Sequence, residues 1–87
     1  MTEVEYIPFG HSDSHGWKID GSKVRFWATK RQAMAAARAI GWPLDSVTPV
    51  WTRFQKGWAI ADGRFGFVSR SSYERLLAER SNEVPAS

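Results

Sequence analysis

The sequence predicts an α+β fold in which an antiparallel sheet of five or six strands carries two helices packed on one face. Three observations support this prediction: an alanine-rich segment with helical periodicity, several short apolar runs with strand character, and Asp-Gly or Lys-Gly dipeptides that separate those runs. The predicted order of elements is βββα-βββα. Residues 1–80 are predicted to form a single domain, and residues 81–87, which lack periodicity, a frayed tail.

The helix predicted over residues 29–41 is the best-defined element. Thr29 and Gln32 have the spacing of a capping box at its start, and Gly41 suits the left-handed conformation that ends a helix. A narrow apolar stripe follows the i, i+3, i+4, i+7 pattern, and it consists of Ala33, Ala36, Ala37 and Ile40. Because alanine side chains are small, this stripe allows the helix to approach a sheet closely.

The segments before this helix are predicted as a strand at residues 4–9, a polar loop at residues 10–16 and a hairpin at residues 17–28. The hairpin is expected to turn at Asp20-Gly21, a dipeptide that tolerates the positive φ of a tight turn. Strand alternation then divides the last six residues into two sets. The set expected to face the helix is Val24, Phe26 and Ala28, and the set on the other side is Lys23, Arg25 and Trp27.

After the helix, a three-stranded meander is predicted from residues 47–55, 58–61 and 64–69. Ser71 and Glu74 have capping-box spacing and begin a second, short helix. With both helices on one face, the opposite face of the sheet is expected to be exposed unless a partner covers it.

The two halves of the chain also resemble each other. Gly16-Trp-Lys-Ile-Asp-Gly21 matches Gly57-Trp-Ala-Ile-Ala-Asp-Gly63 with one inserted residue, and each is followed by a capped helix. This pattern indicates a possible internal duplication. The alternative is convergence, because Gly-Trp and Asp-Gly are common in hairpins.

Composition narrows the functional classes. The chain has 87 residues and no cysteine, so disulfides and thiolate metal sites are excluded. Residues 17–70 contain ten Lys or Arg and three Asp or Glu, which gives +7, whereas the two ends are mildly acidic. This pattern suggests nucleic acid or an acidic protein surface as the partner, or else a solvated surface that binds nothing. No apolar run could span a bilayer and no secretory signal is visible, so a cytoplasmic protein is expected.

Basic and aromatic side chains alternate on the strands that are expected to be exposed. Cations interleaved with rings suit nucleic acid, since cations meet phosphates and rings stack on unpaired bases. Trp and Arg are also the usual hot-spot residues of protein interfaces, and a third interpretation places the rings in a second small core. The candidate binding residues are Lys23, Arg25, Trp27, Trp51, Arg53 and Arg64.

Two segments resemble known families. The sequence Asp62-Gly-Arg-Phe-Gly-Phe-Val68 resembles the aromatic strand of the RNA-recognition motif, which implies base stacking by Phe65 and Phe67. That family needs a further strand after its second helix, and only seven residues follow Arg80, so we expect these rings in the core instead. Residues 17–39 are similar to the plant ethylene-response-factor DNA-binding domain, which implies a DNA-facing sheet bearing Lys18, Lys23, Arg25 and Trp27.

Catalysis finds little support in the sequence. His11, Asp13 and His15 alternate in a polar segment, and we interpret the histidines as solvated rather than as metal ligands. No nucleophile–base pair or phosphate-binding glycine loop is visible, so no enzyme, metal or cofactor is predicted. The sequence therefore predicts a small, non-catalytic protein that binds nucleic acid. The alternative is a stoichiometric inhibitor or adaptor, of the phage or mobile-element accessory type, that docks on a nucleic-acid-handling complex.

Overall fold

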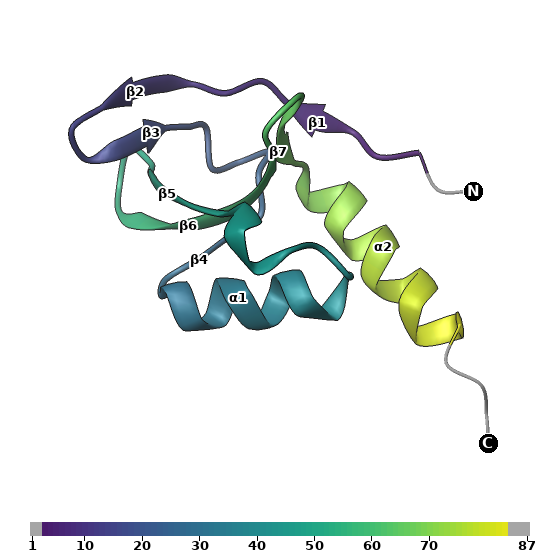
Figure 1. Cartoon of the computed structure of the whole chain (residues 1–87). Coiled ribbons are helices and arrows are strands. Elements are labelled where there is room, and N and C mark those ends of the chain that lie inside the picture. Colours follow the sequence, from purple (N-terminus) through teal and green to yellow (C-terminus); the bar gives the residue numbers. More distant parts are fainter. Residues whose placement is uncertain (1–2, 84–87) are drawn as a thin grey trace.

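The computed structural model describes residues 3–83 and has a mixed α+β fold with two helices, as predicted (Figure 1). The helices are α1 (Lys30–Ala39) and α2 (Arg70–Glu83), and a 3₁₀ turn, η1, spans Leu44–Ser46. The described residues form seven short strands: β1 (Tyr6–Ile7), β2 (His11–Asp13), β3 (Gly16–Lys18), β4 (Phe26–Trp27), β5 (Val47–Trp51), β6 (Lys56–Asp62) and β7 (Gly66–Val68).

The strands form one sheet in the order β1-β7-β6-β5-β3-β2, and β4 pairs with β6. The predicted meander is confirmed, because β5, β6 and β7 are antiparallel neighbours. The prediction of a purely antiparallel sheet is wrong, because β3 runs parallel to β5. The predicted number of strands is also too low. The segment at residues 10–16, expected to be a loop, contains β2, which forms a hairpin with β3.

The hairpin predicted at Asp20-Gly21 is absent. The Asp20 carboxylate accepts hydrogen bonds from the Ser22 hydroxyl at 2.6 Å and the Ser22 amide at 2.9 Å, which hold the pKa of Asp20 below its usual value. These bonds tighten a turn that leads from β3 to β4 without pairing the two strands. Instead, β3 pairs with β2 and β5, and β4 pairs with β6.

Helix α1 has the predicted caps and the predicted buried stripe. At its start, the Gln32 amide donates to Thr29 Oγ1 at 3.2 Å. At its end, Gly41 has φ +79°, and the Trp42 amide donates to the Ala37 carbonyl at 2.9 Å, which is the Schellman arrangement. All four apolar stripe residues are buried: Ala33, Ala36, Ala37 and Ile40.

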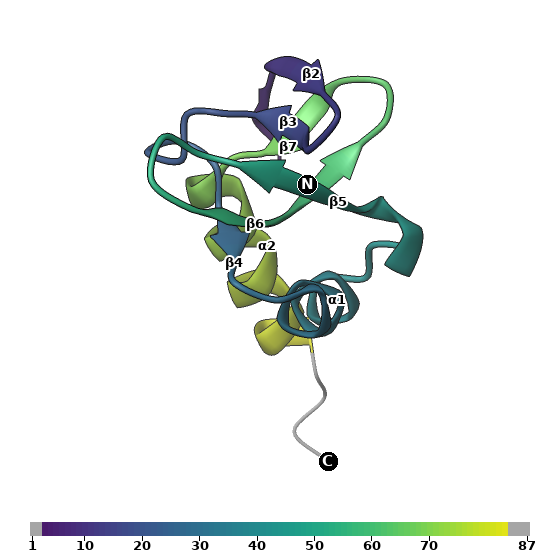
Figure 2. The ribbon, with the colours of Figure 1, turned by 90° about the vertical axis from the view of Figure 1, so that its left-hand side faces the viewer.

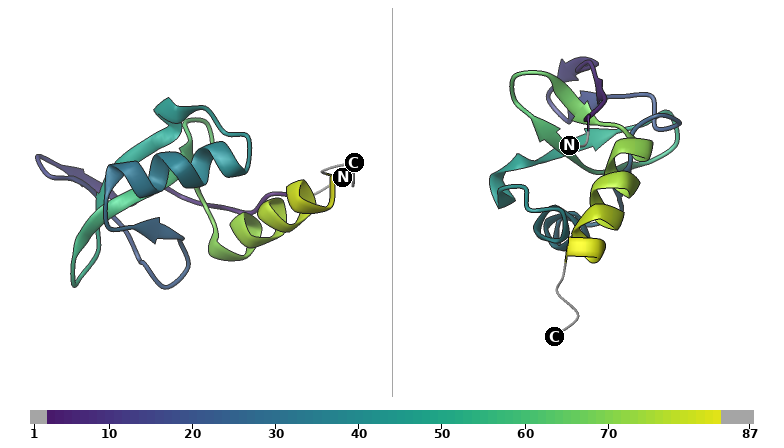
Figure 3. Two further views of the ribbon diagram at one scale, coloured as in Figure 1. Left: turned by 90° about the horizontal axis from the view of Figure 1, so that it is seen from below. Right: turned by 90° about the vertical axis from the view of Figure 1, so that its right-hand side faces the viewer.

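Helix α2 differs from the prediction at both ends. Its cap is Ser69 rather than Ser71, because the Ser72 amide donates to Ser69 Oγ at 3.1 Å. The helix continues to Glu83, so residues 81–83 of the predicted tail are helical, and residues 84–87 lie outside the described residues. Tyr73 and Leu76 pack against the core, and beyond them the helix extends away from the sheet (Figure 3).

One face of the sheet, here called the outer face, carries the helices. Strand alternation directs Val47, Trp58, Ile60 and Val68 toward this side, where they pack with the alanine stripe of α1. Tyr73 from α2 joins the same cluster. Both helices therefore contribute to the core on this face, as predicted, although α2 does so only through its first two turns.

The opposite, inner face is not exposed, which corrects the prediction of a solvent-facing surface there. The sheet curls so that β2 and β3 lie above β5 and β6, with α1 on the other side (Figure 2). A second apolar cluster fills the curl, and its buried members are Ile19, Val24, Val50, Ala59, Ala61 and Phe67. The residues that connect β3 to β4 thus cover the inner face.

This second core reverses the predicted orientation of residues 23–28. Phe26 pairs with Ala59 and Trp27 pairs with Trp58 across the β4–β6 ladder. Because directly paired residues share a face, Phe26 belongs to the inner face and Trp27 to the outer face. Val24 is also in the inner cluster instead of against the helix.

The pairing gives no independent support for an internal duplication. Strands β1, β3 and β4 of the first half each pair with a strand of the second half, whereas β5, β6 and β7 pair among themselves as well. The two halves therefore occupy different positions in the sheet. The duplication remains a prediction from the sequence.

We predict that Ala37→Asp unfolds the domain. Ala37 is fully buried between α1 and the sheet, so the variant places an unpaired carboxylate in the core at a cost of about 3 kcal/mol or more. A domain of this size has a total stability of about 4–13 kcal/mol. Ala35→Asp is the matched control, because Ala35 lies on the same helix but is exposed. Thermal melts followed by circular dichroism should separate the two variants, and equal melts would contradict this packing of α1.

Candidate functional site

The outer face extends beyond the start of α1, and this uncovered end carries a cluster of basic and aromatic side chains. Lys18 pairs with Trp51 across β3 and β5, and Trp51 pairs with Lys56 across β5 and β6. In the next row, Trp58 of β6 pairs with Trp27 of β4. Directly paired residues point to the same side of a sheet, so both rows project from the outer face.

Each of the three tryptophans in these rows has a cation over its ring. Lys18 Nζ lies 5.2 Å from the ring centroid of Trp51. Lys30, at the start of α1, has its Nζ 5.5 Å from the ring of Trp58. The set of Lys18, Lys30, Trp51, Lys56 and Trp58 is called the basic tryptophan surface below.

The third pair stands at the border of this surface. The Arg25 guanidinium lies 5.1 Å from the ring of Trp27, so these two side chains are in contact. All three tryptophan rings are half-buried, while the cations over them are exposed. A half-buried ring is held in place by its neighbours and still presents part of its surface to solvent. The exposed cations are the part of each pair that can move.

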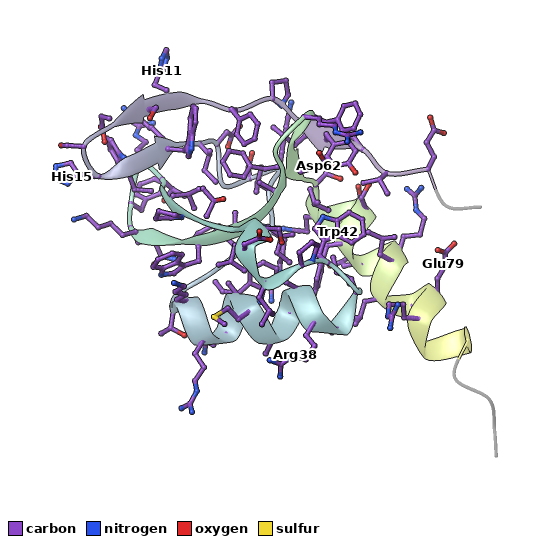
Figure 4. All side chains as sticks on the ribbon, viewed as in Figure 1. His11, His15, Arg38, Trp42, Asp62 and Glu79 are labelled. Atoms are coloured by element: carbon purple, nitrogen blue, oxygen red, sulfur yellow. The ribbon has the colours of Figure 1, made fainter. Side chains whose placement is uncertain are left out.

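The ring of Trp51 is oriented by the β2–β3 hairpin. Its Nε1–H donates to Asp13 Oδ1 at 3.3 Å, and the same carboxylate oxygen accepts the His15 amide at 2.7 Å. The His15 ring meets Trp51 edge-on, with centroids 6.5 Å apart, and lies at the tip of the hairpin (Figure 4). These contacts hold the edge of the indole, whereas Lys18 lies over its ring.

Cations predominate around this surface, and the Asp13 carboxylate that holds the Trp51 indole is an acidic neighbour. Residues 21–61 contain seven Lys or Arg and a single acid, Asp45. The first turn of α1 contains Lys30 and no acidic residue. Acidic residues are normally favoured there, because the amino end of a helix carries partial positive charge. A local feature that opposes stability in this way is typical of a functional position, and it makes the start of α1 suited to an anion.

A protruding loop adjoins Trp51 and Lys56. Phe54 at its tip is 88% exposed, and the Arg53 guanidinium lies 5.9 Å from its ring. The loop is nevertheless ordered by Thr52, whose hydroxyl accepts the amides of Phe54 and Gln55, each at 3.2 Å. The same hydroxyl donates to the Gln55 carbonyl at 3.1 Å. The exposed ring is therefore presented by a defined turn.

The candidate residues named from the sequence are not all brought together. Arg25, Trp27 and Trp51 lie on the outer face, which carries the helices, and not on the opposite face as expected. Three others lie elsewhere: Lys23 beside the start of α2, Arg53 in the β5–β6 loop, and Arg64 in the β6–β7 turn. That last turn contains Asp62, at the other end of the sheet from His15 (Figure 4).

Sequence reasoning missed Lys30, Lys56 and Trp58 as site residues. Lys56 and Trp58 are two residues apart on one strand, so they share a face, and this alternation was a usable signal. The contact between Lys30 and Trp58 joins a helix to a strand more than twenty residues away. No local pattern predicts such a contact.

The aromatic strand that resembles the RNA-recognition motif does not place both rings on one surface. Phe67 is fully buried in the inner cluster and meets Phe9 edge-on, with centroids 4.9 Å apart, so the core interpretation is right for this ring. Phe65 is 58% exposed and stacks on Tyr6 with centroids 5.0 Å apart. Partial burial and the nearby Asp62 carboxylate raise the pKa of Tyr6.

Within residues 3–83, no three His, Cys, Asp or Glu side chains are grouped as they would be around a metal ion. His11 points away from the sheet (Figure 4), and Asp13 is engaged by Trp51. Among these same residues, no helix has the length and apolar character needed to cross a membrane.

No protein-family model matches the chain, and neither does any curated protein or any solved structure. The function must therefore be argued from the geometry of the basic tryptophan surface and its neighbours.

We predict that Thr52→Val loosens the β5–β6 loop. Valine has the shape of threonine but lacks the hydroxyl, so the amides of Phe54 and Gln55 lose their acceptor at a cost of about 1–2 kcal/mol. Urea unfolding gives the loss of stability, and amide exchange should accelerate at both positions. Thr48→Val is the control, because the Thr48 hydroxyl makes one longer bond, at 3.3 Å to Ser46. Equal losses in the two variants would show that Thr52 does not order the loop.

Proposed function

We propose that this protein binds nucleic acid, without turnover, through the basic tryptophan surface. The observation that carries the proposal is the pairing of an exposed cation with each half-buried ring, Lys18 with Trp51 and Lys30 with Trp58. Cations that meet phosphates and rings that stack on bases are the two components of sequence-tolerant nucleic-acid binding. Here both components occur side by side on one face.

Stacking on these rings requires the cations to move, and the energies favour that exchange. An exposed cation–π contact is worth about 0.5–1 kcal/mol. Stacking of a base on an aromatic side chain is worth about 1–3 kcal/mol. A lysine displaced from a ring can reach a phosphate of the same strand, because its side chain is long and its charge is exposed. The exchange therefore gains stacking and an ionic contact for the loss of one weak contact.

The distribution of charge supports an anionic ligand in the same place. Lys18 and Lys56 flank Trp51 on either side within one row of the sheet, and Lys30 begins α1 next to Trp58. Phosphates on both sides of a stacked base would meet cations on both sides of the ring. The partially positive start of α1 adds to this field. The proposal includes a cytoplasmic location, where nucleic acid is accessible.

We predict that Lys18→Ala and Lys56→Ala each flatten the salt dependence of binding. A labelled fifteen-nucleotide oligo-dT is the probe, and anisotropy titrations at several salt concentrations give the slope of log affinity against log salt. Each lost phosphate contact should reduce that slope by about 0.7. Arg38→Ala removes the same charge from the solvent side of α1, pointing away from the sheet (Figure 4), and should leave the slope unchanged.

If Lys18→Ala, Lys56→Ala and Arg38→Ala all reduced the salt slope equally, the net charge of the protein would explain the effect. That result would contradict a binding site at Trp51. Wild-type protein that retards neither DNA nor RNA at low salt, where non-specific binding is strongest, would exclude the proposed function.

The second candidate is a stoichiometric inhibitor or adaptor that docks on the acidic surface of a larger nucleic-acid-handling protein. The observation that favours it is Phe54, an almost fully exposed ring on an ordered loop with Arg53 beside it. Aromatic and arginine side chains that are held in place are typical interface anchors. Binding through Phe54 would depend much less on salt than phosphate contacts, so the same titrations against a candidate protein distinguish the two functions.

A further inference from the structure

A shallow, open hollow lies on the far side of Trp27 from the basic tryptophan surface. It has a volume of about 650 Å³ and is bounded by strand β4 and by both helices. Its floor includes Trp27 and Tyr73, whose rings meet edge-on with centroids 5.1 Å apart. Leu77 of α2 and Ala35 and Ala39 of α1 form its apolar walls. This recess is called the β4 groove below.

Strand β4 presents an open edge to this groove. It pairs with β6 along one side, and the residue before Arg25, Val24, forms an isolated antiparallel bridge with Ser69. Besides the pairing with β6, no turn, loop or cap hydrogen bond within residues 3–83 involves the backbone of residues 26–28. In an antiparallel ladder, alternate backbone groups point away from the paired strand. Those groups of β4 can accept a further strand, which is how extended peptides bind at sheet edges.

Tyr73 also lines the groove and brings a hydroxyl without a described partner. Tyr73 is only 8% exposed, and its hydroxyl makes no hydrogen bond with any side chain or backbone group in the described part of the chain. Burial raises the pKa of Tyr73, an effect that the positive charge of Arg25 partly opposes. The phenol is therefore neutral at physiological pH and has a proton to donate. A donor without a protein partner is free to pair with an acceptor supplied by a ligand.

The charge of the residues that line the groove indicates which acceptor group a ligand would bring. Arg25 is the one charged residue among those that line it, and no acidic residue does. A carboxylate placed there would accept from the Arg25 guanidinium and from the Tyr73 hydroxyl. The small side chains of Ala35 and Ala39, which are exposed one turn apart on α1, leave room for an apolar side chain beside that carboxylate.

We propose that the β4 groove binds an extended acidic segment of a partner protein. The segment adds a strand to the edge of β4, directs an Asp or Glu side chain to Arg25 and Tyr73, and places an alternate apolar side chain against Ala35 and Ala39. A helical ligand would leave the open backbone groups of β4 unpaired, so an extended one fits better. This inference does not rest on nucleic-acid binding, because the groove shares no residue with the basic tryptophan surface.

The test is a titration of isotope-labelled protein with a blocked pentapeptide of alternating valine and glutamate, followed by amide chemical shifts. The amides of residues 25–28 should shift most, and Arg25→Ala should weaken binding roughly tenfold. Arg31→Ala, which removes the same charge from an exposed site on α1, should have little effect. Ala39→Leu, which fills the groove, should abolish binding while leaving the dispersed spectrum of a folded protein.

Four outcomes would overturn the proposal. The first is that no amide signal shifts at millimolar peptide, and the second is that a valine–lysine peptide binds equally well. The third is that a helical acidic peptide binds more tightly. The fourth is that oligo-dT displaces the peptide while the peptide's own shifts are confined to Arg25. The third outcome would identify a helical partner, and the fourth would assign Arg25 to nucleic acid.

Tyr73→Phe provides an independent prediction. Because the hydroxyl has no described partner, the variant should be as stable as the wild type at pH 7 and should bind the glutamate peptide several-fold more weakly. Because burial disfavours the phenolate and raises the pKa of Tyr73, the wild type loses stability as pH rises from about 10, the unfolded value, through the folded value. Alkaline unfolding of the variant should lack that contribution and retain the one from Tyr6. A variant destabilised at pH 7 would show that the hydroxyl is already satisfied.

Discussion

The close contact between the alanine stripe of α1 and the outer face determines where the other elements can lie. Because Ala33 and Ala37 are fully buried and have only a methyl side chain, the helix lies close to β5 and β6. Its two caps limit it to ten residues, so it covers the middle of the outer face and stops short of the end that carries Trp51. The basic tryptophan surface is the part of the sheet that this short helix leaves uncovered.

A chain of 87 residues without cysteine depends on its apolar core for stability, and here it buries apolar surface on both sides of its sheet. The helices provide the core of the outer face. The inner face is filled by Ile19 and Val24, which belong to the segment between β3 and β4. That segment can reach across the sheet only because β3 and β4 do not pair with each other. The parallel pairing of β3 with β5 and the curl of the sheet accompany this arrangement.

The elements that the sequence predicted correctly are those determined by local pattern. The caps of α1, its buried stripe and the β5–β6–β7 meander all depend on residues close together in the chain. Strand β2 was missed because His11–Asp13 is exposed and polar, and its pairing with β3 leaves no apolar periodicity. In the candidate site, too, contacts between residues close in the chain were predicted and contacts between distant residues were not. Arg25 and Trp27, two residues apart, were predicted as a pair, whereas the contact of Lys30 with Trp58 depends on how α1 docks.

Trp27 lies between the two proposed binding sites and connects them physically. Its backbone partner in β6 is Trp58 of the basic tryptophan surface, while its ring contacts Tyr73 in the β4 groove and carries the Arg25 guanidinium. A carboxylate bound in the groove would neutralise Arg25 next to the site for phosphates. Each ligand would then weaken the other, and the coupling would be equal in both directions because binding free energies are reciprocal. Binding of an acidic protein partner in the β4 groove would in this way favour the release of nucleic acid, because Arg25 stands between the two proposed sites.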